Sequence, residues 1–258
     1  MRALAPDQVV VLRDLRRVWP EDKFVVIGAT AVGFHLDFCW RTTRDLDLSI
    51  AADIEECQEA LENRPGWIRH ERILHAWTAP GGVRVDIVPA SVKALEVGRI
   101  DWPDGSTMSA VGLRAAFVDA VCVDVGDETI VRVASAAAIT ILKMAASLDR
   151  LDRERDLADI AHMIEGSIAH DDEERWSNEI LDRNMDYDLV GPFLLGRRVG
   201  VLADERERAV VDRFFKRLDD PADRSASLGR MMRNAPIAWR EEEVALTRLC
   251  AFRYGFES

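Results

Sequence analysis

The stretch RTTRDLDLSI, residues 41–50, places two aspartates inside an apolar alternation. In an extended strand the side chains of residues i and i+2 share one face, so Asp45 and Asp47 should point together while Leu46 and Leu48 face a core. Two carboxylates this close repel each other and tend to take up a proton unless a positive charge lies between them. A divalent cation meets that need, so we predict a buried strand whose polar face carries metal ligands.

A third aspartate stands in a similar setting in VRVDIVP, residues 83–89. If this apolar strand neighbours the first one, Asp86 joins Asp45 and Asp47 in one cluster. Three carboxylates are enough to hold two Mg²⁺ ions roughly 3.5–4 Å apart, the arrangement used for in-line nucleotidyl displacement. Mn²⁺ is the alternative ion for such oxygen ligands. Two aspartates in one strand more often mark a solvated edge, but the third aspartate favours a metal site.

The segment VVIGATA reads as a buried strand that turns into a short helix at Gly28. Glycine lets a backbone come close to a ligand, and the free N–H groups at a helix start suit a phosphate. Ala29 would offer such an N–H group and Thr30 a hydroxyl. Further along, Arg41 and Thr43 are candidates for triphosphate contacts, although an arginine here would also simply neutralise the acids.

Lys143 stands in the apolar helical pattern ITILKMAAS, where a lysine is uncommon unless it is paired or reaches a polar site. Asp156 and Asp159 follow it in RERDLADI. One interpretation is a helical wall opposite the acids that directs Lys143 toward a phosphate or a base. The other is an ordinary intrahelical ion-pair network, and the sequence leaves both open.

The patterns divide the 258 residues into a mixed α/β region, 1–133, and an all-helical region, 134–258. We therefore predict an α+β fold, a mixed β-sheet with helices, followed by helices that contribute to the active-site cleft. Strands are expected at 23–28, 44–50, 67–79 and 83–90, with a hairpin over 120–133. Helices are expected at 6–19, 29–38, 53–63, 134–151 and 152–166, and helical periodicity continues over 171–184, 191–202, 205–218 and 241–252.

The net charge of −12 argues against a surface coated with basic residues for nonspecific nucleic-acid binding, but not against a local basic groove. Five arginines are candidates for a track that binds RNA: Arg150, Arg153, Arg155, Arg197 and Arg198. The four cysteines show no CxxC spacing, and no apolar run approaches the roughly 20 residues that span a bilayer. We therefore expect a cytoplasmic protein with reduced thiols and no membrane contact.

The motifs GATA, RTTRDLDL, VDI and RERDLAD, together with Lys143, resemble the nucleotidyltransferase AbiEii/AbiGii toxin family. This family is a branch of the polymerase-β-like nucleotidyltransferase superfamily, and the match covers about residues 25–160. It implies a nucleotidyltransferase α/β core, an attached helical domain and an NTP–Mg²⁺ substrate. The family pattern assigns metal binding to Asp45, Asp47 and Asp86, triphosphate binding to Gly28 and its neighbours, and completion of the active site to Lys143 and Asp156.

For some members, the resemblance also implies transfer of nucleotides to the 3′ end of tRNA, which blocks translation, and a separate antitoxin protein as partner. One departure concerns the turn, where the superfamily favours Gly-Ser or Gly-Gly and this chain has Gly28-Ala29. Ala29 lacks the serine hydroxyl, so Thr30 or backbone groups must serve the phosphate instead.

The leading hypothesis is a toxin-like, metal-dependent nucleotidyltransferase, in which a hydroxyl of RNA attacks the α-phosphate of an NTP and releases pyrophosphate. A second hypothesis keeps this chemistry but uses a small molecule, such as an antibiotic, or a protein side chain as acceptor, and it gains if the arginines are scattered. A third is an inactive binding module that acts through a partner protein. Asp45→Asn or Asp86→Asn should abolish transfer under the first two and leave the function intact under the third.

Overall fold

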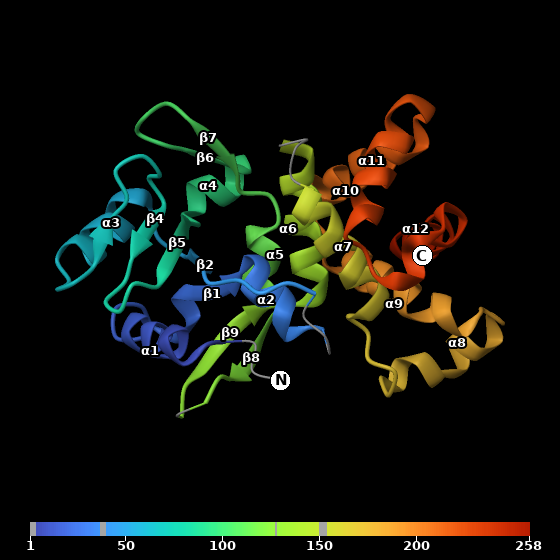
Figure 1. Cartoon of the computed structure of the whole chain (residues 1–258), viewed down its shortest axis with the longest axis horizontal. Coiled ribbons are helices and arrows are strands. Elements are labelled where there is room, and N and C mark those ends of the chain that lie inside the picture. The colour runs from blue at the N-terminus through green and yellow to red at the C-terminus, as the bar shows by residue number, and fades with distance from the viewer. Residues whose placement is uncertain (1–3, 37–39, 127, 150–153) are drawn as a thin grey trace. The chain divides into compact units, whose positions relative to one another are not determined.

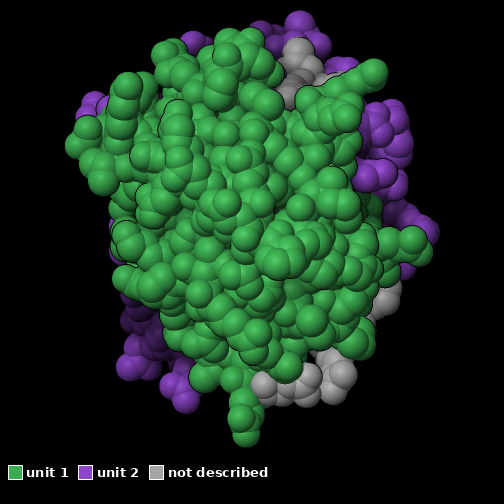
Figure 2. Space-filling model, turned by 90° about the vertical axis from the view of Figure 1, so that its left-hand side faces the viewer, with its two compact units in different colours: residues 1–34, 38–135 green, residues 35–37, 136–258 purple. Residues whose placement is uncertain are grey.

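The computed structural model describes residues 4–36, 40–126, 128–149 and 154–258. The chain forms two compact units, the first made of residues 1–34 and 38–135 and the second of residues 35–37 and 136–258 (Figure 2). The first unit contains the β-sheet with its helices, and the second is helical. The α+β fold class predicted from the sequence is therefore confirmed.

Within the described part of the chain, a seven-stranded sheet forms the centre of the first unit, in the order β3-β4-β5-β2-β1-β9-β8 (Figure 1). Its strands are β1 (Phe24–Ile27), β2 (Leu46–Ile50), β3 (Ile68–Arg69), β4 (Ala76–Thr78), β5 (Arg84–Pro89), β8 (Ala120–Asp124) and β9 (Ile130–Ala134). Strand β2 runs antiparallel to β1 and parallel to β5, while β1 runs parallel to β9. The sheet is therefore mixed, as predicted.

The central strand β2 follows the alternation of its sequence. Leu46 and Leu48 are fully buried, whereas Asp47 between them is part-exposed. Ser49, on the same side as Asp47, is buried and donates a hydrogen bond to the Val88 carbonyl at 3.0 Å. The polar side of β2 is thus open only at the start of the strand, where the aspartates lie.

Short helices and a hairpin complete the first unit. They are α1 (Pro6–Leu15), α2 (Gly28–Phe34), α3 (Ile54–Glu62), α4 (Val92–Val97), α5 (Leu113–Val118), the 3-10 turn η1 (Glu21–Lys23) and the strands β6 (Arg99–Asp101) and β7 (Thr107–Ser109). Asp53 caps α3 as predicted, because its carboxylate accepts a hydrogen bond from the Glu56 N–H at 2.8 Å. Helix α1 begins at Pro6 itself, a position where a missing N–H is tolerated.

The segment 67–79 is not the continuous strand that its sequence predicts. It forms two short antiparallel strands, β3 and β4, and only β4 pairs with β5 in the expected hairpin. The intervening chain turns at His70, whose Nδ1 lies 3.2 Å from the N–H groups of both Arg72 and Ile73. The N–H groups of Arg72 and Ile73 thus have a hydrogen-bond acceptor within the turn itself and do not take part in strand pairing.

The second unit consists of helices packed around a buried aromatic core. They are α6 (Ala136–Asp149), α7 (Glu154–Gly166), α8 (Asn178–Asp182), α9 (Tyr187–Leu202), α10 (Glu205–Asp219), α11 (Pro221–Arg233) and α12 (Glu242–Glu257), with the 3-10 turns η2 (Glu173–Trp176) and η3 (Ile237–Arg240). Helices α9 and α12 come close because Gly255 faces the Phe193 carbonyl and Gly196 faces the Phe252 carbonyl, where a Cβ would collide. Both phenylalanines are fully buried.

Helix α11 is absent from the elements that the sequence predicts. Its buried face consists only of Ser227, Leu228 and Met231, too few apolar residues to produce a helical periodicity. No helix in the described ranges combines the length and the apolar character required to cross a membrane.

Candidate active site

Two of the predicted metal ligands are direct neighbours in the sheet. Asp47 of β2 lies opposite Asp86 of β5 in the parallel register. Because neighbouring strands lie roughly 4.8 Å apart, the two side chains leave the same face of the sheet side by side. Asp45 precedes the first residue of β2, two positions before Asp47. On the other side, Asp86 faces Ala76 of β4, whose small side chain leaves the carboxylate room.

Gly28 makes space for the Asp47 carboxylate. It follows β1, whose last residue, Ile27, pairs with Asp47. Its φ of +64° lies in the left-handed region that favours glycine, and a Cβ there would collide with the Asp47 side chain, including its Cβ at 2.6 Å. The next residue, Ala29, has its N–H directed at Asp47 Oδ2, 3.4 Å away. In this structure the turn at Gly28 therefore leaves space for the Asp47 carboxylate and directs a backbone N–H at it.

The predicted phosphate-binding hydroxyls lie against the backbone of the acidic motif. Thr30, which is buried, donates to the Asp45 carbonyl at 3.0 Å, and Thr43 donates to the same oxygen at 3.4 Å. Both threonines thus fix the chain at Asp45. The Arg41 guanidinium lies over the Trp40 ring, 5.4 Å from its centroid. The two hydroxyls therefore have a positioning role that the sequence did not reveal.

Arg84 is a site residue that the sequence reasoning missed. Its Nε and Nη2 donate to the two oxygens of Asp86 at 3.0 and 3.1 Å. The hydrogen bond with Asp86 raises the pKa of Arg84 above its ordinary value, and the charges of Asp86, Asp45 and Asp47 add to the shift against a smaller effect of burial. The signal was present in VRVD, because residues two apart in a strand share a face.

The donor set fits a divalent ion in its chemistry, since hard carboxylate oxygens are the ligands that Mg²⁺ prefers. The space left by Gly28 keeps the Asp47 side chain clear of the β1 turn. In the part of the chain that the structure describes, no group of three or more His, Cys, Asp or Glu side chains is arranged so that it could hold a metal ion. The Asp86 carboxylate is instead directed at Arg84. To share an ion with Asp47, it would have to turn from that guanidinium.

Lys143 and its two aspartates form a buried cluster within the second unit. The Nζ of Lys143 on α6 lies 2.8 Å from both Asp156 Oδ1 and Asp159 Oδ2 on α7. Burial alone would lower the pKa of Lys143, but the charges of Asp159 and Asp156 and their hydrogen bonds outweigh it and raise the pKa. The pairing joins two helices, so it is not the intrahelical network considered from the sequence.

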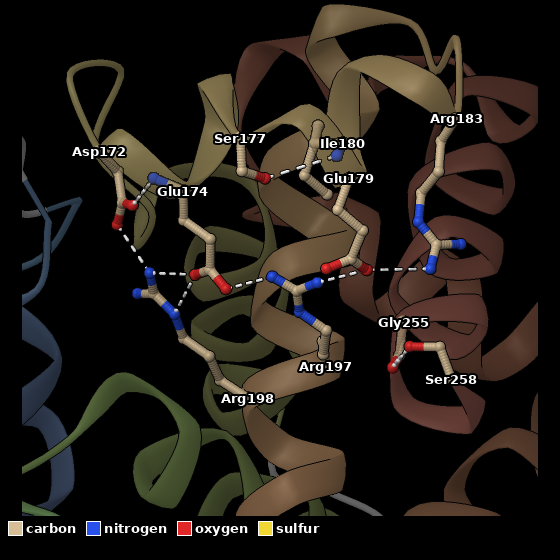
Figure 3. A network of polar contacts seen from close by, with 10 residues as sticks. All are labelled: Asp172, Glu174, Ser177, Glu179, Ile180, Arg183, Arg197, Arg198, Gly255 and Ser258. Atoms are coloured by element: carbon tan, nitrogen blue, oxygen red, sulfur yellow. Dashed lines mark hydrogen bonds and ion pairs between the residues drawn. The ribbon is translucent and has the colours of Figure 1, made fainter.

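Two of the five arginines proposed for an RNA track are held in ion pairs. Arg198 contacts Asp172 at 2.8 Å and Glu174 at 2.7 Å, and Arg197 contacts Glu174 and, at 2.8 Å, Glu179 (Figure 3). These contacts fasten the η2–α8 segment to α9. Of the other candidates, Arg155 is exposed, and Arg150 and Arg153 lie outside the described residues.

The mixed sheet with two aspartates paired on adjacent central strands is the arrangement that the resemblance to nucleotidyltransferases implies. The model of the family described as "Nucleotidyl transferase AbiEii toxin, Type IV TA system" matches residues 10–243, and the chain belongs to that family. The chain is therefore an enzyme for nucleotidyl transfer, from a toxin family, as the motifs predicted.

Among solved structures, the chain is similar to an antigenic nucleotidyltransferase-like protein from Paracoccidioides brasiliensis, with a TM-score of 0.41 and 18% sequence identity. The similarity covers 70% of this chain and 91% of that one. No curated protein matches the chain.

Proposed function

We propose that this enzyme is a toxin that uses Mg²⁺ to transfer a nucleotide from an NTP to the 3′ end of tRNA. The 3′ hydroxyl oxygen would form a bond to the α-phosphorus while the bond to the β-phosphate oxygen breaks. The proton of the hydroxyl passes to solvent water, and pyrophosphate leaves with the electron pair of the broken bond. The observation that carries the proposal is the pairing of Asp47 with Asp86 in one register beside the Gly28 turn.

Asp45, Asp47 and Asp86 would hold the metal, which we propose is a pair of Mg²⁺ ions, with Mn²⁺ as the alternative ion. Such ions would supply Lewis-acid activation of the acceptor hydroxyl and neutralise charge on the leaving pyrophosphate. The surrounding residues would set the geometry. Thr30 fixes the Asp45 backbone by its hydrogen bond at 3.0 Å, and Gly28 leaves the volume that the Asp47 carboxylate needs.

For the triphosphate, the proposed contacts are Gly28, Ala29 and Arg41. Arg41 is the strongest of them, because a guanidinium binds phosphate with two parallel hydrogen bonds. Thr30 and Thr43 spend their hydroxyls on Asp45 in this structure, so they would contribute mainly by positioning.

The family pattern also assigns Lys143 and Asp156 to the nucleotide. Lys143 is bracketed at 2.8 Å by two carboxylates, which supports an additional structural role for this cluster.

A second class of acceptor competes with tRNA in this proposal. The ion pairs of Arg197 and Arg198 with acidic side chains leave these arginines poorly suited to hold an RNA backbone. That observation favours the second candidate function, transfer to a small molecule or a protein side chain. The toxin family favours RNA, and it supports a cognate antitoxin as partner.

The experiment is incubation of the purified protein with Mg²⁺, each α-³²P-labelled NTP in turn and total tRNA. Label on tRNA with wild type, lost with Asp47→Asn and retained with Asp124→Asn on the edge strand β8, would establish the RNA acceptor and name the nucleotide. Label on an added small molecule or on protein alone would select the second candidate. An Asp47→Asn variant as toxic to cells as wild type would indicate the inactive binding module.

A further inference from the structure

The Arg84–Asp86 ion pair occupies a carboxylate that the proposed metal site needs. Both oxygens of Asp86 accept from the guanidinium, at 3.0 and 3.1 Å. The Asp86 side chain is 16% exposed, while that of Arg84 is 41% exposed. The Asp86 carboxylate is therefore mostly covered, whereas the Arg84 guanidinium reaches solvent. The guanidinium can rotate into solvent without a change in the backbone fold.

The position of this pair distinguishes it from an ordinary surface contact. Asp86 lies beside Asp47 in the register of β2 and β5, and the charges of Asp45 and Asp47 also act on Arg84. Three carboxylates close together repel one another unless a cation lies among them. The Arg84 guanidinium, which donates to both oxygens of Asp86, brings positive charge to this cluster.

We propose that Arg84 is a displaceable counter-ion that competes with the divalent metal for Asp86. Without metal, the guanidinium holds the Asp86 carboxylate and balances the acidic cluster. When a divalent ion binds, the Arg84–Asp86 contact opens and the carboxylate turns toward the ion. This inference rests on the proposed function, because it assumes that the three aspartates are the metal site. Arg84 is then a positioning residue that stabilises the metal-free protein and weakens metal binding.

The opposing effects can be measured without the reaction. Replacing Arg84 by glutamine removes a unit positive charge from beside the Asp86 carboxylate, so Mn²⁺ should bind about tenfold more tightly, equivalent to about 1.4 kcal/mol. The melting temperature of the metal-free variant should fall, and saturating Mn²⁺ should restore it. Arg84→Lys keeps the charge but loses the two-pronged contact, so its Mn²⁺ affinity should rise by only about threefold.

The chain offers a matched control on β6. Arg99 donates to both oxygens of Asp101 at 2.7 and 3.4 Å, with the same two-residue spacing along a strand. Both side chains are more than half exposed, and no second carboxylate pairs with Asp101 in the register of β6 and β7. Arg99→Gln should therefore leave the Mn²⁺ affinity unchanged.

The test is titration of Mn²⁺, followed by electron paramagnetic resonance of the free ion, for wild type, the three variants and Asp47→Asn. Tighter Mn²⁺ binding by Arg84→Gln and, to a lesser degree, by Arg84→Lys supports the inference. Measurable Mn²⁺ binding by the variants supports it also when wild type binds too weakly to measure. Affinities of both Arg84 variants equal to or lower than that of wild type overturn it. Binding by wild type that Asp47→Asn does not weaken refutes the metal site of the proposed function instead, and the inference with it.

Discussion

The Gly28→Ala substitution tests the claim that this glycine exists to accommodate the Asp47 carboxylate. Two effects should add. A non-glycine residue at a φ of +64° costs roughly 1–2 kcal/mol. The new Cβ also meets the Asp47 side chain, and insertion of a methyl group into an occupied space costs roughly 1–3 kcal/mol. We expect the free energy of unfolding to fall by about 2–5 kcal/mol.

The matched control is Gly105→Ala. Gly105 has a φ of +83°, and a Cβ there would meet nothing within 4 Å. Its substitution should cost only the backbone contribution, about 1–2 kcal/mol. The assay is urea unfolding followed by circular dichroism, with both variants compared to wild type. Gly28→Ala should be the more destabilised of the two and should also lose nucleotidyl transfer, because Asp47 is displaced. Equal destabilisation of both variants would refute the reasoning.

Three further predictions concern buried and paired groups. Lys143→Met leaves two buried aspartates without their cation, so the free energy of unfolding should fall by about 3–5 kcal/mol in urea, and a fall below 1 kcal/mol would contradict the buried pairing. Burial alone would raise the pKa of Asp172, but the hydrogen bond from Arg198 outweighs it and lowers this pKa. The pair therefore stabilises the fold above the ordinary carboxylate pKa of about 3.9, and this stabilisation is lost as the pH falls through the lowered pKa. Arg198→Gln should therefore flatten the acid side of the stability–pH curve, and an unchanged curve would count against the pair. Burial raises the pKa of Cys57 to about 12, so iodoacetamide at pH about 8 should label the exposed Cys122 in the native protein and spare Cys57, as mass spectrometry of the peptides would show.

The central part of the fold and the paired acids could be predicted because their signals are local. The alternation in RTTRDLDLSI identified strand β2, and the apolar setting of Asp86 identified β5. Their adjacency was a condition of the predicted cluster and did not follow from the sequence itself. The structure brings Asp47 and Asp86 into one register, and which ligand they hold stays a prediction.

Other features could not be read from the sequence because they depend on packing. The contact of Arg84 with Asp86 requires the side-chain orientations, and many strands carry such a pair, as Arg99 and Asp101 do on β6. Helix α11 buries too few apolar residues to show a periodicity. The role of Gly28 depends on the register of β1 with β2, which decides what the missing Cβ would meet.

The central claim is that Asp86 belongs to the active site, and its most direct test is the rate of pyrophosphate release by Asp86→Asn. With cell extract as the source of the acceptor, this rate can be measured before the acceptor is identified. Asp101→Asn is the matched control, since Asp101 also accepts from an arginine two residues before it on a strand. The account predicts a loss of about 100-fold or more for Asp86→Asn and an unchanged rate for Asp101→Asn. Wild-type rates in both variants would contradict it.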